Sequence, residues 1–395
     1  MPSFATLPEP SKTALQHSHN VQQVIRSKIQ SSDNWITFAD YMELVLYAPG
    51  LGYYSGGTTK FGEFGDFVTA PEISTLFGQT LARQAQQVLN LLDHADILEF
   101  GAGSGKLALD LLLKLEKLAC LPNQYFILEL SADLRQRQQT LFKNQAPHLL
   151  PLLHWLDELP TQFNGFMVAN EVLDAMPVHL VTWRGKKLFE RGVTWQNDKF
   201  SWQERPLLSG QLYDIARKLT TQDDTNDIQS ECYTSEISLA ARKFIGSLNE
   251  ILQQGAAILI DYGFGSDEYY HPQRDQGTLM CHYRHHSHDD PFYLPGLQDV
   301  TSHVDFSAVY HSMENTDLNL IGYTTQAHFL INCGITSIVS QTPAEQTGEY
   351  LPLSNQLQKL ASTAEMGELF KVIALGKKID EPLIGFTSGD KSHLL

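Results

Sequence analysis

The sequence is poor in the features that mark secreted and membrane-spanning proteins. Its 395 residues include 4 cysteines, which are widely spaced and form no Cys-x-x-Cys pair. This argues against a disulfide framework and favours a reducing compartment. No apolar run reaches the roughly 20 residues of a transmembrane helix, and residues 1–20 lack the apolar core of a signal peptide. We therefore expect a cytoplasmic protein without a membrane partner.

Basic residues are also scarce. Lysine and arginine total 28 against 45 aspartates and glutamates, a formal net charge of -17. DNA and RNA binding requires a positively charged surface, so we expect no nucleic-acid partner. The acidic balance suits a small cationic cofactor or a basic protein segment better.

What the sequence does contain is a predicted strand, a glycine-rich turn and a helix in direct succession. The apolar run 96–100 is followed by Gly101, Gly103 and Gly105, and then by a helical pattern over 105–118. Glycine lets the backbone approach a nucleotide-like ligand closely, because it has no Cβ and tolerates positive φ. The turn therefore predicts a nucleotide-like cofactor.

Three cofactor classes compete for this turn. A phosphate-binding loop would need glycine at Phe100 and a hydroxyl residue at Leu107, so it is excluded. A dinucleotide fingerprint needs a small residue at the position that Lys106 occupies. This weakens the case for a nicotinamide-dependent oxidoreductase but does not exclude it. The third class is the S-adenosylmethionine-dependent methyltransferases.

Acidic residues at the ends of three successive predicted strands favour S-adenosylmethionine. Methyltransferases of this class place an acidic residue two positions before the first glycine to hold the methionine end of the cofactor, and Glu99 is similar in position. Glu129 would bind the ribose hydroxyls, since an ionised carboxylate can accept from two donors, and Asp157 would accept from the adenine amine. We predict cofactor contacts from Glu99, Gly101, Gly103, Gly105, Glu129, Leu130 and Asp157.

The chain alternates strands and helices from residue 96 onward, which predicts an α/β fold with a parallel sheet. A polar and apolar alternation over 178–204 indicates an inserted β-hairpin, and a helix is expected over 235–253. We expect strands over 96–100, 125–130, 152–156, 166–170 and 256–261. We divide the chain into a flexible tail (1–19), a helical cap (20–92), a cofactor-binding core (93–177 and 255–380), an insertion (178–254) and a C-terminal tail (381–395).

Several further segments resemble those of one family. They are GDFVTAPEISTLFG at 65–78, VANEVLDAMPV at 168–178, IDYG at 260–263, GTL at 277–279 and DVTSHVDF at 299–306. In this order, over about residues 20–375, they resemble the MidA-like family of class I methyltransferases. That family includes the mitochondrial complex I assembly factor that modifies an arginine of a respiratory subunit.

The resemblance implies a fold and a function. The fold would be Rossmann-like, with a mostly parallel seven-stranded sheet, helices on both faces and a helical N-terminal cap. The function would be methylation of an arginine in a protein partner that carries a basic segment. The alternative is a non-catalytic assembly factor that keeps the cofactor fold in order to bind a client. The hairpin insertion suggests a docking surface or a homodimer contact.

Asn170, Glu171 and Asp174 are the predicted catalytic residues. They follow a predicted strand, and such strand ends face the cofactor in sheets of this class. Glu171 and Asp174 are three residues apart, so a helical turn would bring both carboxylates to one side. They could grip a protonated guanidinium, and Asn170 could orient it. The alternative is that both acids simply charge a helix N-terminus.

The remaining assignments come from the resemblance. Pro71, Glu72 and Ser74 would cap the cofactor, with Asp66 toward the substrate, although helix capping by Ser74 explains part of this segment equally well. Asp305 is expected on the substrate side. Tyr262, which follows the predicted strand 256–261, is also expected there from its position, although a packed aromatic side chain would explain it equally well. The histidine-rich stretch 281–290 matches no zinc-binding pattern, and no metal is expected.

Overall fold

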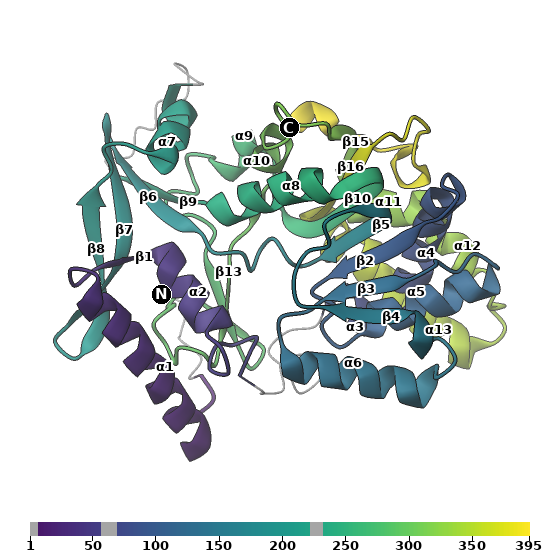
Figure 1. The fold of residues 1–395 in the computed structure, drawn as a ribbon, viewed down its shortest axis with the longest axis horizontal. Helices are drawn as coiled ribbons and strands as arrows, with labels where there is room; N and C mark the ends of the chain where they lie inside the picture. Colours follow the sequence, from purple (N-terminus) through teal and green to yellow (C-terminus); the bar gives the residue numbers. More distant parts are fainter. Residues whose placement is uncertain (1–6, 57–68, 222–231) are drawn as a thin grey trace.

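The computed structural model describes residues 7–56, 69–221 and 232–395. A large, mostly parallel sheet lies at one end of the molecule, and a smaller antiparallel sheet packs with the N-terminal helices at the other (Figure 1). None of the helices in these three ranges is both long enough and apolar enough to cross a membrane.

The main sheet follows the strand order β15-β16-β10-β5-β2-β3-β4, and the short β14 pairs with the end of β10. Its members are β2 (Asp96–Phe100), β3 (Tyr125–Leu128), β4 (Leu153–Leu156), β5 (Phe163–Asn170), β10 (Leu252–Phe264), β14 (Val304–Asp305), β15 (Asn319–Thr325) and β16 (Phe370–Lys377). Only β16 runs antiparallel to its neighbours along this path. The prediction of a mostly parallel seven-stranded sheet is confirmed, with one short strand in addition.

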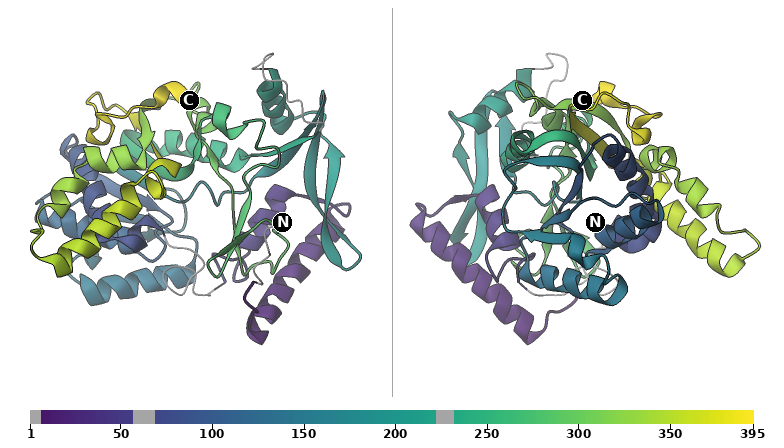
Figure 2. Two further views of the ribbon diagram at one scale, coloured as in Figure 1. Left: turned by 180° about the vertical axis from the view of Figure 1, so that it is seen from behind. Right: turned by 45° about the vertical axis from the view of Figure 1, so that its right-hand side comes forward.

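Helices bury both faces of the main sheet, as expected. They are α4 (Thr75–Asn90), α5 (Lys106–Lys117), α6 (Ala132–Gln145), α8 (Leu239–Ile251), α10 (Phe306–His311), α11 (Gln326–Asn332), α12 (Ile335–Val339), α13 (Thr347–Ala361) and α14 (Met366–Leu369). Successive residues of a strand point to opposite faces. Ile97 therefore joins the apolar core with α4 and α5, and Leu98 joins the core with α8. Figure 2 shows the yellow-green C-terminal helices on the outer side of this sheet, far from the purple N-terminal helices.

A five-stranded antiparallel sheet packs against the N-terminal helices. The two helices are α1 (Lys12–Ser31) and α2 (Phe38–Tyr47), and the strands are β1 (Ile36–Thr37), β6 (His179–Arg184), β7 (Lys187–Gln196), β8 (Lys199–Pro206) and β9 (Tyr233–Ile237). Phe38 and Tyr41 of α2 share a buried core with Val193 and Phe200 of the sheet. The remaining elements are α3 (Ala70–Ile73), α7 (Gln211–Thr221), α9 (Ser266–Tyr269), the small sheet of β11 (Met280–Tyr283), β12 (His286–His288) and β13 (Asp299–Thr301), and the 3₁₀-helices η1 (Leu150–Leu152), η2 (Ile384–Phe386) and η3 (Ser392–Leu394).

Several predicted boundaries are wrong. Helix α1 begins at Lys12, where Ser11 accepts a hydrogen bond from the Ala14 N–H, so the expected tail 1–19 is helical from residue 12. Its first turns carry few apolar residues, so periodicity did not mark them. The inserted hairpin is a three-stranded meander, and residues 235–237 form part of a strand. The C-terminal segment 381–395 packs on the core, where Leu383 is buried.

Two helices lie outside the unit in which the sequence places them. Helix α4 packs on α5 and the main sheet, although its residues fall within the expected cap. Helix α8 packs on β10, although its residues fall within the expected insertion. The unit that contains the antiparallel sheet takes α1, α2 and β1 from before the glycine turn in the sequence and β6 to β9 from after it.

Candidate active site

A cavity of about 360 Å³ opens at the carboxyl ends of β2, β3 and β5. Helix α2, the turn that follows it and α3 close its other side, so both halves of the molecule contribute to the walls. The lining residues that carry the argument below are Glu43, Tyr47, Tyr54, Pro71, Glu72, Glu99, Gly101, Gly103, Glu129, Leu130, Asn170 and Glu171.

The glycine turn forms one wall of this cavity in a conformation that glycine favours. Gly101, Gly103 and Gly105 have φ angles of 62°, 54° and 85°. Gly101 and Gly103 line the cavity, whereas Gly105 lies behind it at the start of α5. A Cβ on Gly105 would lie 3.0 Å from Cγ of Gln138, so the third glycine permits close packing of α6.

Glu99 and Glu129 are two buried carboxylates beside this turn. The Tyr125 hydroxyl donates to Oε2 of Glu99 at 2.6 Å. Glu129 accepts from the Ser131 N–H at 3.0 Å and from Nε2 of Gln138 at 3.2 Å. Leu130, beside Glu129, is 68% exposed at the cavity and offers an apolar surface. A close backbone turn, two carboxylates and this apolar surface fit a nucleoside with hydroxyl groups.

Asp157 does not line the cavity, contrary to its predicted place. Its side chain is 90% exposed and forms an ion pair of 2.6 Å with Arg135. Arg135 also donates to the carbonyl oxygens of Glu129 and Leu156, so it ties the ends of β3 and β4 together. Because this arginine lies on α6, the position of Asp157 at a strand end gives no sign of the ion pair.

The segment before α4 contributes to the cavity in part. Pro71 and Glu72 line it, and the Ser104 hydroxyl of the glycine turn donates to Glu72. Ser74 does not line the cavity: it accepts from the Leu76 N–H as the N-cap of α4 and donates to Gln356. The helix-capping explanation therefore describes Ser74. Asp66 lies outside the described residues.

Glu171 reaches the cavity from a left-handed turn and not from the expected helix. Its φ is 53°, and its Oε1 accepts from Nδ2 of Asn170 at 3.1 Å and from the Ala70 N–H at 3.4 Å. This conformation is unfavourable in free energy for a residue other than glycine, and such residues cluster at functional sites. Burial, and then repulsion from Asp174, raise the pKa of Glu171 to about 8.

Asp174 is buried behind Glu171 and does not line the cavity. Burial raises the pKa of Asp174, and a hydrogen bond from Tyr262 offsets part of that rise. Oδ2 of Asp261 accepts from three consecutive N–H groups of Val172, Leu173 and Asp174, at 3.2, 2.9 and 3.2 Å. Asp261 therefore holds the turn that presents Glu171. No role was predicted for Asp261, although it is the last residue of the predicted strand 256–261.

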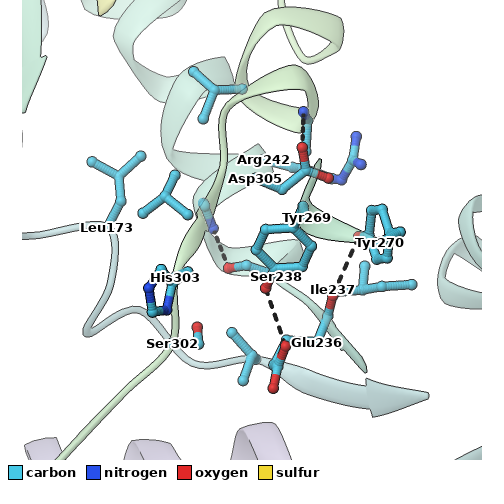
Figure 3. A pocket seen from close by; sticks show the side chains of 15 residues that line it. Leu173, Glu236, Ile237, Ser238, Arg242, Tyr269, Tyr270, Ser302, His303 and Asp305 are labelled. Atoms are coloured by element: carbon cyan, nitrogen blue, oxygen red, sulfur yellow. Dashed lines mark hydrogen bonds between the residues drawn. The ribbon is translucent and has the colours of Figure 1, made fainter. Parts of the chain in front are cut away.

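The predicted substrate residues Tyr262 and Asp305 lie outside the cavity. Tyr262 contacts the ring of His303 edge-on and stands behind Asp174. Asp305 caps α10 by accepting from the Ala308 N–H, and it faces a separate small cavity together with Tyr269 and Tyr270 (Figure 3). In that second cavity Glu236 accepts from the Tyr269 hydroxyl, which ties β9 to α9. The geometry of the main cavity therefore gives no support to the predicted substrate-binding roles of Tyr262 and Asp305.

The comparisons with known proteins settle the family. A family model for S-adenosyl-L-methionine-dependent methyltransferases matches residues 80–324, more than half of the chain. The chain belongs to this family. A protein from Burkholderia thailandensis, whose crystal structure contains S-adenosyl-homocysteine, is 47% identical to this methyltransferase, with a TM-score of 0.93 and coverage of 99% of this chain and 100% of that one.

The names of more distant relatives also state a substrate class. "Protein arginine methyltransferase NDUFAF7 homolog, mitochondrial" of Drosophila melanogaster is 28% identical, with 96% of this chain and 91% of the relative covered. "Protein arginine methyltransferase NDUFAF7, mitochondrial" of Danio rerio is 27% identical, with 86% and 83% covered. The predicted MidA-like membership, class I fold, enzyme class and cofactor are confirmed.

Several lining residues of the methyltransferase cavity were not predicted. Tyr47 and Glu43 come from α2, and Tyr54 comes from the turn that follows. They lie far from the glycine turn in the sequence, so the strand-end pattern does not indicate them. The one available signal was the pair Tyr53 and Tyr54 between Gly52 and Gly56. No group of three or more metal-binding side chains gathers within the described parts of the chain.

Replacing Glu99 with glutamine is expected to stabilise the cofactor-free methyltransferase in alkali and to weaken its binding of S-adenosylmethionine. Burial raises the pKa of Glu99 from 4.5 to about 7. The folded protein thus binds this proton more tightly than the unfolded chain does, and stability is lost as the pH rises through about 7. The glutamine variant should be more stable by up to about 3 kcal/mol at pH 9 and unchanged at pH 4. Thermal unfolding at both pH values, with cofactor titration by calorimetry, measures this. Equal shifts in melting temperature at the two pH values would contradict it.

Proposed function

We propose that this methyltransferase methylates a guanidinium nitrogen of an arginine in a protein partner. The observation that carries the proposal is the charge of the cavity. Among the described residues, five glutamates line it, and no lysine or arginine does. A guanidinium carries only donors and a positive charge, so a wall of carboxylates complements it.

The position of Glu171 gives the proposed chemistry. S-adenosylmethionine supplies a methyl group on a sulfonium, and alignment for in-line attack is the main contribution of a protein to such a step. Both hydrogen bonds that Glu171 accepts within the described residues end on Oε1. Oε2 is then able to accept from the guanidinium, orient one nitrogen and offset the charge as that nitrogen loses its proton. Asn170 and Asp174 would act by positioning Glu171.

The distant relatives support the same substrate class, since their names describe protein arginine methyltransferases. A respiratory-complex client, a homodimer and a cytoplasmic location remain predictions. The acidic net charge of -17 suits a basic partner segment.

Labelled S-adenosylmethionine tests the proposal. The full chain is incubated with the labelled cofactor and a cell lysate, and the labelled proteins are hydrolysed for amino-acid analysis. Label in methylarginine supports the proposal. Label in methyl-lysine or another residue contradicts it. Tight cofactor binding by calorimetry without label in any protein would instead favour the non-catalytic assembly factor.

A further inference from the structure

The side of the cavity opposite the glycine turn is aromatic. Tyr47 and Tyr54 both line it, and their rings stack with centroids 5.5 Å apart and planes inclined by 24°. Both residues come from the N-terminal part of the chain, whereas the carboxylates Glu99 and Glu129 come from the main sheet. One cavity thus has a cofactor side and an aromatic side, with Glu171 among its lining residues.

The hydroxyl groups of both tyrosines donate their protons to hydrogen bonds within the protein. The Tyr47 hydroxyl donates to the Ala175 carbonyl at 2.9 Å. The Tyr54 hydroxyl donates to the Asp299 carboxylate, whose two oxygens lie at 3.0 Å each. Asp299 is 2% exposed, so its carboxyl group does not face solvent. The two hydroxyl oxygens therefore offer lone pairs and no further donor to a guest.

We infer that Tyr47 and Tyr54, with Asp299 as the positioning residue of Tyr54, form a subsite that recognises the guanidinium group of the substrate. The inference rests on the proposed function. A guanidinium has five donors, no acceptor and a flat, weakly hydrated cation that stacks on aromatic rings. An ammonium lacks the planar fork, and a neutral urea group lacks the charge, so both should bind less well. Glu43, an exposed residue that also lines the cavity, adds a negative charge there.

Three small probes test this subsite directly. The full chain is saturated with S-adenosyl-homocysteine and titrated with N-acetyl-arginine amide, N-acetyl-citrulline amide and N-acetyl-lysine amide, with binding followed by NMR. We expect the arginine probe to bind about tenfold more tightly than either of the others. Equal binding of the citrulline probe would overturn the inference, because citrulline keeps the planar shape without the charge.

Two variants separate the ring from its hydroxyl. Tyr54→Leu should weaken the arginine probe about tenfold, and Tyr54→Phe, which keeps the packing, should weaken it about threefold. Tyr310→Leu on α10, where Tyr310 is 37% exposed, is the matched control and should change nothing. Cofactor affinity should be unchanged in all three variants. Wild-type probe affinity in Tyr54→Leu would overturn the inference.

The outcomes distinguish this inference from the function on which it rests. Selective arginine binding without methyl transfer to arginine would contradict the proposed function and leave the subsite standing. Methyl transfer to arginine with unchanged KM in both Tyr54 variants would contradict the subsite and leave the function standing.

Discussion

Replacement of Glu171 by glutamine is expected to lower the rate of methyl transfer by about 100-fold or more, with little change in S-adenosylmethionine affinity. The variant keeps the size of the side chain and its acceptor for the Asn170 and Ala70 donors. It loses the negative charge toward which a guanidinium would direct its donors. Removal of one positioned electrostatic partner of a transition state typically costs this much.

The pH profile carries a second signature of the same residue. Burial and Asp174 raise the pKa of Glu171 to about 8, so in most molecules this side chain is protonated at neutral pH. The rate of the unmodified enzyme should therefore rise with pH through about 8, as the accepting carboxylate forms. The residual rate of the glutamine variant should lack this rise. Since Asp174 and Asp261 interact with Glu171, the observed midpoint belongs to the group of carboxylates.

Single-turnover rates and calorimetry measure these effects. Glu116→Gln, on the outside of α5 beside His148, is the matched control and should retain both rate and affinity. A Glu171→Gln enzyme with the rate and pH profile of the unmodified one would show that Glu171 is not a catalytic residue. A large loss of cofactor affinity would move its role to the cofactor side.

The cofactor half of the site could be predicted because its signals are local. A buried parallel strand appears in the sequence as an apolar run, and a turn that needs positive φ is marked by its glycines. Glu99 and Glu129 follow from their places at strand ends. Asp157 shows the limit of that rule, because Arg135 of a neighbouring helix binds it and only the folded chain brings the two together.

The substrate half depends on contacts between distant segments. Tyr54 meets Asp299 across 245 positions, and Asp261 holds the turn at 172–174 across nearly 90. Periodicity contains no information on such pairs. The spacing of Glu171 and Asp174 suggested a helix, but the N–H groups of this turn are satisfied by Asp261, and the backbone at Glu171 is left-handed. Here tertiary contacts override local preference.

Replacement of Gly255 by alanine is expected to destabilise the fold by roughly 3–5 kcal/mol, because it combines backbone strain with a steric clash in the centre of the sheet. Gly255 lies opposite Gly165 in the β5–β10 ladder. Its φ is 136°, and a Cβ there would lie 1.9 Å from the Gly165 carbonyl oxygen. That oxygen belongs to a neighbouring backbone in a central strand, so it cannot move aside without breaking the ladder.

Denaturant unfolding of the cofactor-free protein measures this loss. Gly246→Ala is a matched control, because Gly246 lies inside α8 and a Cβ there would meet nothing within 4 Å. That variant should be as stable as the unmodified protein or up to about 1 kcal/mol more stable, since alanine favours a helix over glycine. Similar unfolding free energies for the two variants would show that the ladder relaxes around Gly255.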